Sequence, residues 1–150
     1  MNTDLILANV EKHIHLSKKE TEYFLSLLEP GFIKKKDFLL EEGEVCKHSS
    51  FVVIGCLKAF SVDKEGIEHI LNFACREWWI ADMYSLISQK PAILSIEALV
   101  DTHVLKLSRD KQQELFKKVP AFERFFRILI ENSLVANHQR IINQSISPQQ

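Results

Sequence analysis

The chain has 150 residues, enough for one domain with a single hydrophobic core. Hydrophobic residues make up 46% and charged residues 26%, which is ordinary for a globular protein and excludes a disordered or fibrous chain. The formal net charge is -1, so the chain lacks the basic field that holds nucleic acid. Only four glycines occur, and none belongs to a glycine-rich loop of the type that binds nucleotide phosphates.

The cysteines and the apolar runs indicate the cellular compartment in which the protein is expected. Cys46, Cys56 and Cys75 form an odd set without a C-x-x-C pair, which predicts free thiols in a reducing cytoplasm rather than disulfides or a zinc site. Asp4 and Glu11 interrupt the first apolar stretch, and no later run approaches the ~18 apolar residues of a spanning helix. We therefore expect a cytoplasmic protein without a signal peptide or membrane segment.

Residues 3–29 have helical periodicity with a break near Leu16. Residues 17–20 have the S-x-x-E form of a capping box, which predicts the start of a second helix at Ser17. Pro30 and Gly31 are expected to end that helix.

From residue 32 to residue 107 the pattern changes to short strand-like runs separated by turns. The runs span residues 38–40, 51–54, 56–62, 67–73, 93–100 and 104–107. The turn at Glu65 and Gly66 predicts a hairpin across residues 56–73. Several strands at this spacing are typical of a sandwich, jelly roll or barrel.

After Leu107 the period is helical again. Ser108 is expected to cap a short helix, and Pro120 separates it from a longer helix over residues 121–144. The apolar face of the long helix is wide, which fits either contact with the same helix of a second subunit or an irregular core helix. The candidate dimer contacts are Leu134, Val135, Ile141 and Ile142.

Six histidines raise the alternative of a small cupin-like metal-dependent enzyme. His13 and His15 form the only H-x-H pair, but on a helix residues two apart point in different directions. His69 is the only histidine well placed on a predicted strand, and no local signature pairs a cysteine with a histidine for catalysis. We therefore expect neither a metal site nor catalytic residues.

Five segments carry a resemblance to a known family. They span residues 38–44, 51–60, 63–68, 78–85 and 96–99, and Leu105 and Leu107 follow them in the chain. Together they resemble the glycine turns, tip hairpin and cassette of the cyclic nucleotide-binding effector domain of Crp/Fnr-type transcription regulators. The resemblance implies an α+β, mainly β fold: a jelly-roll β-roll (double-stranded β-helix) flanked by N-terminal helices and a long C-terminal dimerisation helix.

The resemblance also implies a domain organisation. Residues 1–147 are expected to form one effector domain, with N-terminal helices over 1–30, the β-roll over 31–107 and C-terminal helices over 108–147. In the resembling regulators a helix-turn-helix domain follows, and Ser147 and Pro148 look like the start of its first helix. We expect the native chain to continue into that DNA-binding domain, with a stand-alone effector-binding module as the alternative.

The family's ligand is a cyclic nucleotide, whose phosphate is held by backbone donors of the cassette and an arginine, and whose ribose is held by an acidic residue. The cassette glycine corresponds to Ala81, the acidic residue to Asp82 and the arginine to Ala92. No arginine occurs between Arg76 and Arg109. Because a buried phosphate needs a cationic partner, we expect a degenerate cassette that does not bind cyclic AMP tightly, and either a less charged effector or an empty roll.

If a ligand binds, the resemblance places it against two groups of residues. The cassette supplies Ala81, Asp82, Met83 and Tyr84, and the long helix supplies Asn137, Gln139 and Arg140. Asp82 has the alternative role of capping the cassette helix, and Arg140 that of a surface ion pair. The sequence thus predicts a non-enzymatic, homodimeric, ligand-sensing domain, with DNA bound only through a further domain.

Overall fold

The computed structural model describes the backbone of residues 2–146 and the side chains of residues 2–136. Ser147 and Pro148, where a following helix is expected, therefore lie outside the described residues. Within the described backbone, no helix is long and apolar enough to cross a membrane.

Two helices open the chain, α1 (Asp4–Glu11) and α2 (Lys18–Ser26). The capping box is confirmed: Glu20 N donates to Ser17 Oγ at 3.1 Å, and Ser17 N donates to Glu20 Oε1 at 2.8 Å. The expectation that Pro30 and Gly31 end the helix is wrong. The helix ends at Ser26, and both residues lie inside a strand, β1 (Glu29–Ile33).

The β-roll consists of two four-stranded antiparallel sheets, in the orders β1-β8-β3-β6 and β2-β7-β4-β5. Its remaining strands are β2 (Phe38–Leu40), β3 (His48–Ile54), β4 (Cys56–Val62), β5 (Glu68–Cys75), β6 (Trp79–Ile80), β7 (Ser95–Ala98) and β8 (Thr102–Ser108). This confirms the predicted mainly β architecture with flanking helices. Strand β1 was not predicted; its proline and glycine are tolerated because β1 is at the edge of its sheet.

Two hydrophobic cores lie on opposite faces of β3 and β8. Phe51 belongs to the core beneath the helices and its neighbour Val52 to the core inside the roll, and both side chains are fully buried. Side chains alternate across a strand, so one pair of strands divides the two cores. Trp79 packs on Phe51 and its Nε1 donates to Asn9, whereas Trp78 is 59% exposed. The adjacent tryptophans thus separate into an inner and an outer side chain.

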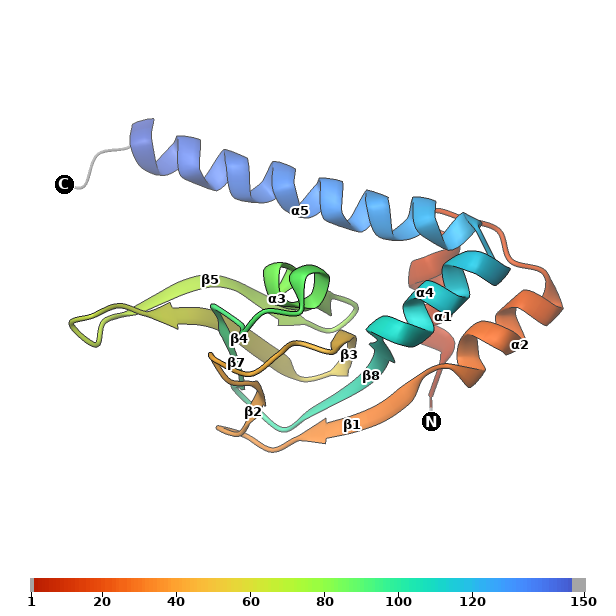
Figure 1. Ribbon diagram of the computed structural model, residues 1–150, viewed down its shortest axis with the longest axis horizontal. Coiled ribbons are helices and arrows are strands. Elements are labelled where there is room, and N and C mark those ends of the chain that lie inside the picture. Colours follow the sequence, from red (N-terminus) through yellow and green to blue (C-terminus); the bar gives the residue numbers. More distant parts are fainter. Residues whose placement is uncertain (1, 147–150) are drawn as a thin grey trace.

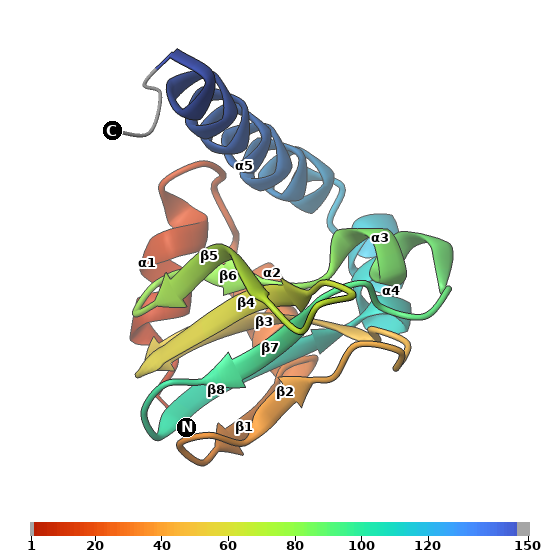
Figure 2. The same ribbon diagram turned by 90° about the vertical axis from the view of Figure 1, so that its left-hand side faces the viewer.

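Three further helices complete the fold, one between β6 and β7 and two after β8. They are α3 (Met83–Ser88), α4 (Arg109–Lys118) and α5 (Ala121–Ile146). Ser108 caps α4 as predicted, accepting a hydrogen bond from Lys111 N at 3.2 Å. Helices α1, α2 and α4 cover one end of the roll, while α5 runs along one side of it (Figure 1). Turned by 90°, α5 projects away from the strands (Figure 2).

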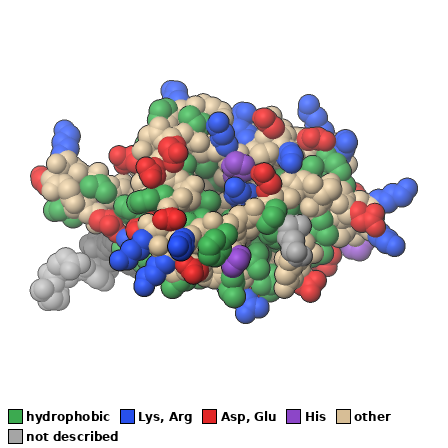
Figure 3. Space-filling view, turned by 90° about the horizontal axis from the view of Figure 1, so that it is seen from below, with side chains coloured by type: hydrophobic (Ala, Val, Ile, Leu, Met, Phe, Trp, Pro, Cys, Tyr) green, Lys and Arg blue, Asp and Glu red, His purple; other side chains and the backbone are tan. Residues whose placement is uncertain are grey.

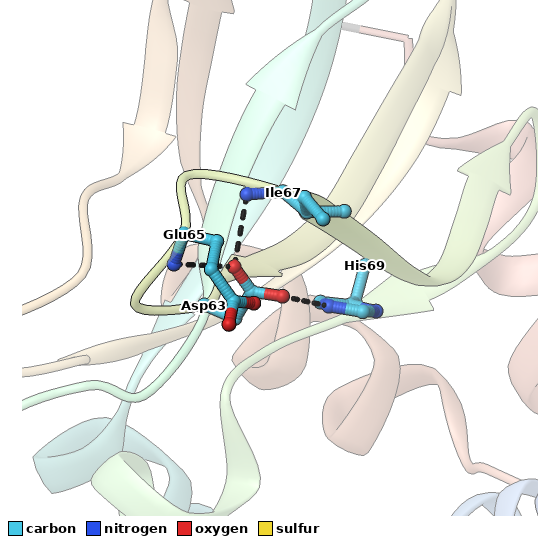
Figure 4. A network of polar contacts seen from close by, with 4 residues as sticks. All are labelled: Asp63, Glu65, Ile67 and His69. Atoms are coloured by element: carbon cyan, nitrogen blue, oxygen red, sulfur yellow. Dashed lines mark hydrogen bonds and ion pairs between the residues drawn. The ribbon is translucent and has the colours of Figure 1, made fainter.

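The predicted hairpin joins β4 to β5, and Asp63 organises its tip (Figure 4). Asp63 Oδ1 accepts hydrogen bonds from Glu65 N at 2.9 Å and Ile67 N at 3.0 Å. Asp63 Oδ2 lies 2.7 Å from His69 Nε2, and this hydrogen bond lowers the pKa of the Asp63 carboxyl. The side chain of His69 is 60% exposed at this tip, so the best histidine for a cupin-like metal site lies outside the roll.

The prediction of three free thiols is wrong for two of the cysteines. Cys56 and Cys75 face each other across β4 and β5, with 4.1 Å between their Cα atoms, and form a disulfide. The predicted hairpin ended two residues before Cys75, so the register that pairs these cysteines was missed. Cys46 is free and buried. The thiol argument for a reducing compartment therefore no longer holds.

Candidate ligand-binding site

The cassette connects β6 to β7 through the short helix α3. Asp82 caps this helix: Oδ1 of its carboxylate accepts a hydrogen bond from Ser85 N at 3.0 Å. The helix ends at Gln89, whose φ of 58° turns the chain out of the helix. The Gln89 side chain donates to the Leu86 carbonyl at 2.8 Å and so satisfies one of the last helical acceptors. The capping role that sequence offered for Asp82 is the one that the structure displays.

The Asp82 carboxylate does more than cap. Its second oxygen, Oδ2, accepts hydrogen bonds from Ile93 N at 2.9 Å and Leu94 N at 3.1 Å. Asp82 is 1% exposed, and no lysine, arginine or histidine within the described part of the chain forms an ion pair with it. Three backbone donors from two segments thus converge on one buried carboxylate, which is the arrangement of an anion-binding nest.

Ser85 and the chain after α3 fix this nest in place. Ser85 is fully buried; its Oγ donates to the Lys90 carbonyl at 2.6 Å and accepts from Cys46 N at 2.8 Å. Ala92 N donates to the Glu44 carbonyl at 2.7 Å, and Gly43 N donates back to the Ala92 carbonyl at 2.9 Å. These bonds tie the cassette to the turn before β3. The positions of the Ile93 and Leu94 donors are therefore set by the roll itself.

The structure separates the four cassette candidates. Asp82 points inward to the nest, and Ala81 lines a cavity inside the roll. Met83 and Tyr84 lie on the outer surface and are 37% and 47% exposed. Their contact with a ligand stays a prediction. The candidates Asn137, Gln139 and Arg140 lie outside the described side chains, as do Ile141 and Ile142.

Ala92 occupies the position that the resemblance gives to the phosphate arginine. Its side chain is 3% exposed and belongs to the core inside the roll. Lys90, the nearest cationic residue in the chain, is exposed. This chain thus has a small buried methyl group where the resemblance implies a charged guanidinium.

Chemistry at the remaining polar groups is limited. Burial raises the pKa of the Cys46 thiol, which keeps it protonated near neutral pH and makes it a poor nucleophile. No group of three or more His, Cys, Asp or Glu side chains that could hold a metal ion occurs among the residues the structure describes. On the face drawn in Figure 3, basic and acidic side chains are interspersed with hydrophobic ones, without the single-sign field of a nucleic-acid surface.

A family profile, the cyclic nucleotide-binding domain, matches residues 30–119, more than half of the chain. The chain belongs to the cyclic nucleotide-binding domain family. The match covers the whole β-roll and α4 of this cyclic nucleotide-binding domain, and it confirms the resemblance drawn from the sequence. Among curated proteins, none matches the chain in sequence.

Solved structures share the fold of this cyclic nucleotide-binding domain at low identity. A cyclic nucleotide-binding domain from Methylobacillus flagellatus has a TM-score of 0.78 at 20% identity, over 98% of this chain and 85% of that one. The Thermus thermophilus catabolite activator protein has a TM-score of 0.74 at 19% identity, over 87% of this chain. The sensor domain of the transcriptional regulator DNR from Pseudomonas aeruginosa has a TM-score of 0.71 at 18% identity, over 93% of this chain and 90% of that one. The match spans only 61% of the catabolite activator protein's length.

Sequence reasoning missed the second half of the nest. The spacing Asp82-x-x-Ser85 is a visible capping signal, but Ile93 N and Leu94 N are main-chain groups 11 and 12 residues further along. Main-chain donors carry no residue-type signature, so only the fold of the segment after α3 could reveal them.

Proposed function

We propose that this chain is the ligand-sensing and dimerisation domain of a cytoplasmic Crp/Fnr-type transcription regulator, with a cassette closed to cyclic nucleotides. Family membership and the shared fold with regulators support the sensing role. In this proposal the domain is not an enzyme, and DNA is read by a helix-turn-helix domain outside these 150 residues.

The observation that carries the proposal is the Asp82 carboxylate in the nest. In the family pattern, backbone donors of the cassette hold the phosphate, and here the donors of Ser85, Ile93 and Leu94 already bind this carboxylate. Two anions sharing a buried site repel each other strongly, and Ala92 supplies no compensating charge. The chain's own carboxylate therefore acts as the anion that fills the cassette.

Cyclic AMP and cyclic GMP are expected to leave the melting temperature of the protein unchanged. A ligand at about 100 times its Kd stabilises the folded state by about 2.7 kcal/mol, which is several degrees for a domain of this size. Thermal unfolding with increasing nucleotide measures this, with calorimetry as the second readout. A saturable rise with either nucleotide contradicts the closed cassette.

The dimerisation part of the proposal rests on α5. Leu134 and Val135 are 64% and 59% exposed on this helix. In the sequence, Ile141 and Ile142 follow them by seven residues each, which is two helical turns, the spacing at which we expect an apolar stripe to continue. A stripe of this kind on a helix that projects from the roll is suited to packing against the same helix of a second copy (Figure 2).

Sedimentation equilibrium is expected to give the wild-type protein twice its 17.4 kDa chain mass. The double variant Leu134→Asp with Val135→Asp should be monomeric, because it places charges within the apolar stripe. The control, Ser133→Asp with Ala136→Asp, adds the same charge to the opposite side of α5 and should remain dimeric. A monomeric wild-type protein, or a dimeric Leu134 and Val135 variant, contradicts the dimer.

A further inference from the structure

A cavity of about 470 Å³ is lined by residues of β2, β3, β6, β7 and β8 and of the turn before β3. Its apolar wall includes Leu40, Ile80 and Ile96, and its polar lining includes His48, Ser50 and Lys106. Neither Asp82 nor its partners Ile93 and Leu94 line it. The volume falls within the range of small-molecule sites.

Three charged residues line this cavity, of which Glu44 and Lys47 are exposed and Lys106 is half-buried. Lys106 lies opposite Ser50 in the register of β8 and β3 and opposite Glu29 in that of β8 and β1. Gly31 leaves room for its side chain: a Cβ at Gly31 would lie 3.3 Å from Lys106 Cε and 3.0 Å from Val104 Cγ2. The end of the lysine stem thus lies over Gly31 of β1, and the residue lines the cavity.

The ammonium group of Lys106 has no carboxylate within ion-pair distance among residues 2–136. Lys58, a lysine on the other sheet, contrasts with it, because Lys58 contacts both Glu68 and Glu97. A half-buried lysine that lacks a counter-ion leaves its charge available to a ligand.

The polar groups near Lys106 supply hydrogen-bond donors to the cavity and little negative charge that would neutralise the lysine. Ser50 is 2% exposed and lines the cavity. Burial and the Lys106 ammonium lower the pKa of His48, so its imidazole is neutral near pH 7, with Nε2 at 3.7 Å from Glu29 Oε2. Glu44 also lines the cavity, but its Oε1 accepts a hydrogen bond from Glu41 N at 2.7 Å.

We propose that this cavity binds a small organic monocarboxylate, with the carboxylate between Lys106 and Ser50 and the apolar body against Leu40, Ile80 and Ile96. An ammonium and a hydroxyl above an aliphatic wall complement that chemistry, since the charged pair forms in a partly water-free site. The proposal rests on the sensing function and deepens it by naming an effector class. The site shares Ala81 with the cassette but none of the donors that bind Asp82.

Hexanoate is the probe, with hexanamide and hexylamine as the neutral and cationic controls. Calorimetry is expected to show saturable binding of hexanoate, with hexanamide at least about tenfold weaker and hexylamine not bound, because only hexanoate pairs with the ammonium. In NMR spectra, the amide signals of Ser50, Ile80 and Lys106 should move, and those of Ser85 and Ile93 should not. Equal affinity for hexanoate and hexanamide, or no saturable binding, overturns the proposal.

Lys106→Met keeps an unbranched side chain one atom shorter and removes its charge, so hexanoate affinity should fall about tenfold or more. Lys117→Met, at an exposed position on α4, makes the same change in net charge and should bind as the wild type does. Ser50→Ala provides a second test if Lys106→Met fails to fold, and it should weaken binding while preserving the fold. Unchanged binding by a folded Lys106→Met or Ser50→Ala protein overturns the proposal, whereas nucleotide binding at the cassette overturns only the proposed closure.

Discussion

Asp82→Ala is expected to lower the free energy of unfolding by about 3 to 5 kcal/mol, since it leaves three buried N–H groups without an acceptor. These donors belong to Ser85, Ile93 and Leu94, and the carboxylate they share is 1% exposed. Urea unfolding measures the loss. Inorganic phosphate should then restore part of the stability of Asp82→Ala, because it fills the emptied nest, while sodium chloride at equal ionic strength should not.

Asp63→Ala is the matched control for this change. The Asp63 carboxylate also accepts two backbone hydrogen bonds, from Glu65 N and Ile67 N, but at the exposed tip of the β4–β5 hairpin. Water can replace it there, so the loss of stability should be clearly smaller. Equal losses in the two variants, or a phosphate effect as large in wild type as in Asp82→Ala, contradict the role given to Asp82.

Gly55→Ala is expected to destabilise the protein by about 3 kcal/mol or more, because strain and a backbone clash coincide. Gly55 turns the chain from β3 to β4 with a φ of +107°. A Cβ there would lie 2.4 Å from Thr102 Oγ1, 2.7 Å from Thr102 Cα and 2.8 Å from the Asp101 carbonyl oxygen. Two of these atoms are main chain, so the start of β8 would have to move.

Gly66→Ala is the control that measures the cost of backbone strain without a steric clash. Gly66 has a φ of +83°, but a Cβ there meets nothing within 4 Å. Only the left-handed backbone conformation disfavours alanine here, so the free energy of unfolding should fall by about 1 to 2 kcal/mol. Urea unfolding of both variants gives the comparison, and a loss at Gly55 no larger than that at Gly66 would mean that the contact with Thr102 is not limiting.

Much of the fold could be predicted from residue patterns, because those elements carry local signals. The capping box at Ser17, the cap at Ser108 and the hairpin turn at Gly66 are indicated by the types of neighbouring residues. Strands β1 and β6 could not be predicted, since β1 contains Pro30 and Gly31 and β6 has two residues. Their conformation is set by pairing with β8 and β3, far along the chain.

The candidate site was predictable in outline only. The missing arginine and the acidic Asp82 could be read from the sequence once the family resemblance was drawn. What the carboxylate does depends on two main-chain donors in the segment after α3, and what Lys106 does depends on which face of β8 it occupies. The pairing of Cys56 with Cys75 was missed because the predicted hairpin ended two residues too early.

The amide signals of Ser85, Ile93 and Leu94 test most directly whether the cassette is closed. In NMR spectra of the wild-type protein, millimolar cyclic AMP is expected to leave all three signals in place, because their protons are already bonded to Asp82. Saturable movement of these signals as the nucleotide is added would show that a phosphate displaces the carboxylate, and the cassette would then be an open nucleotide site.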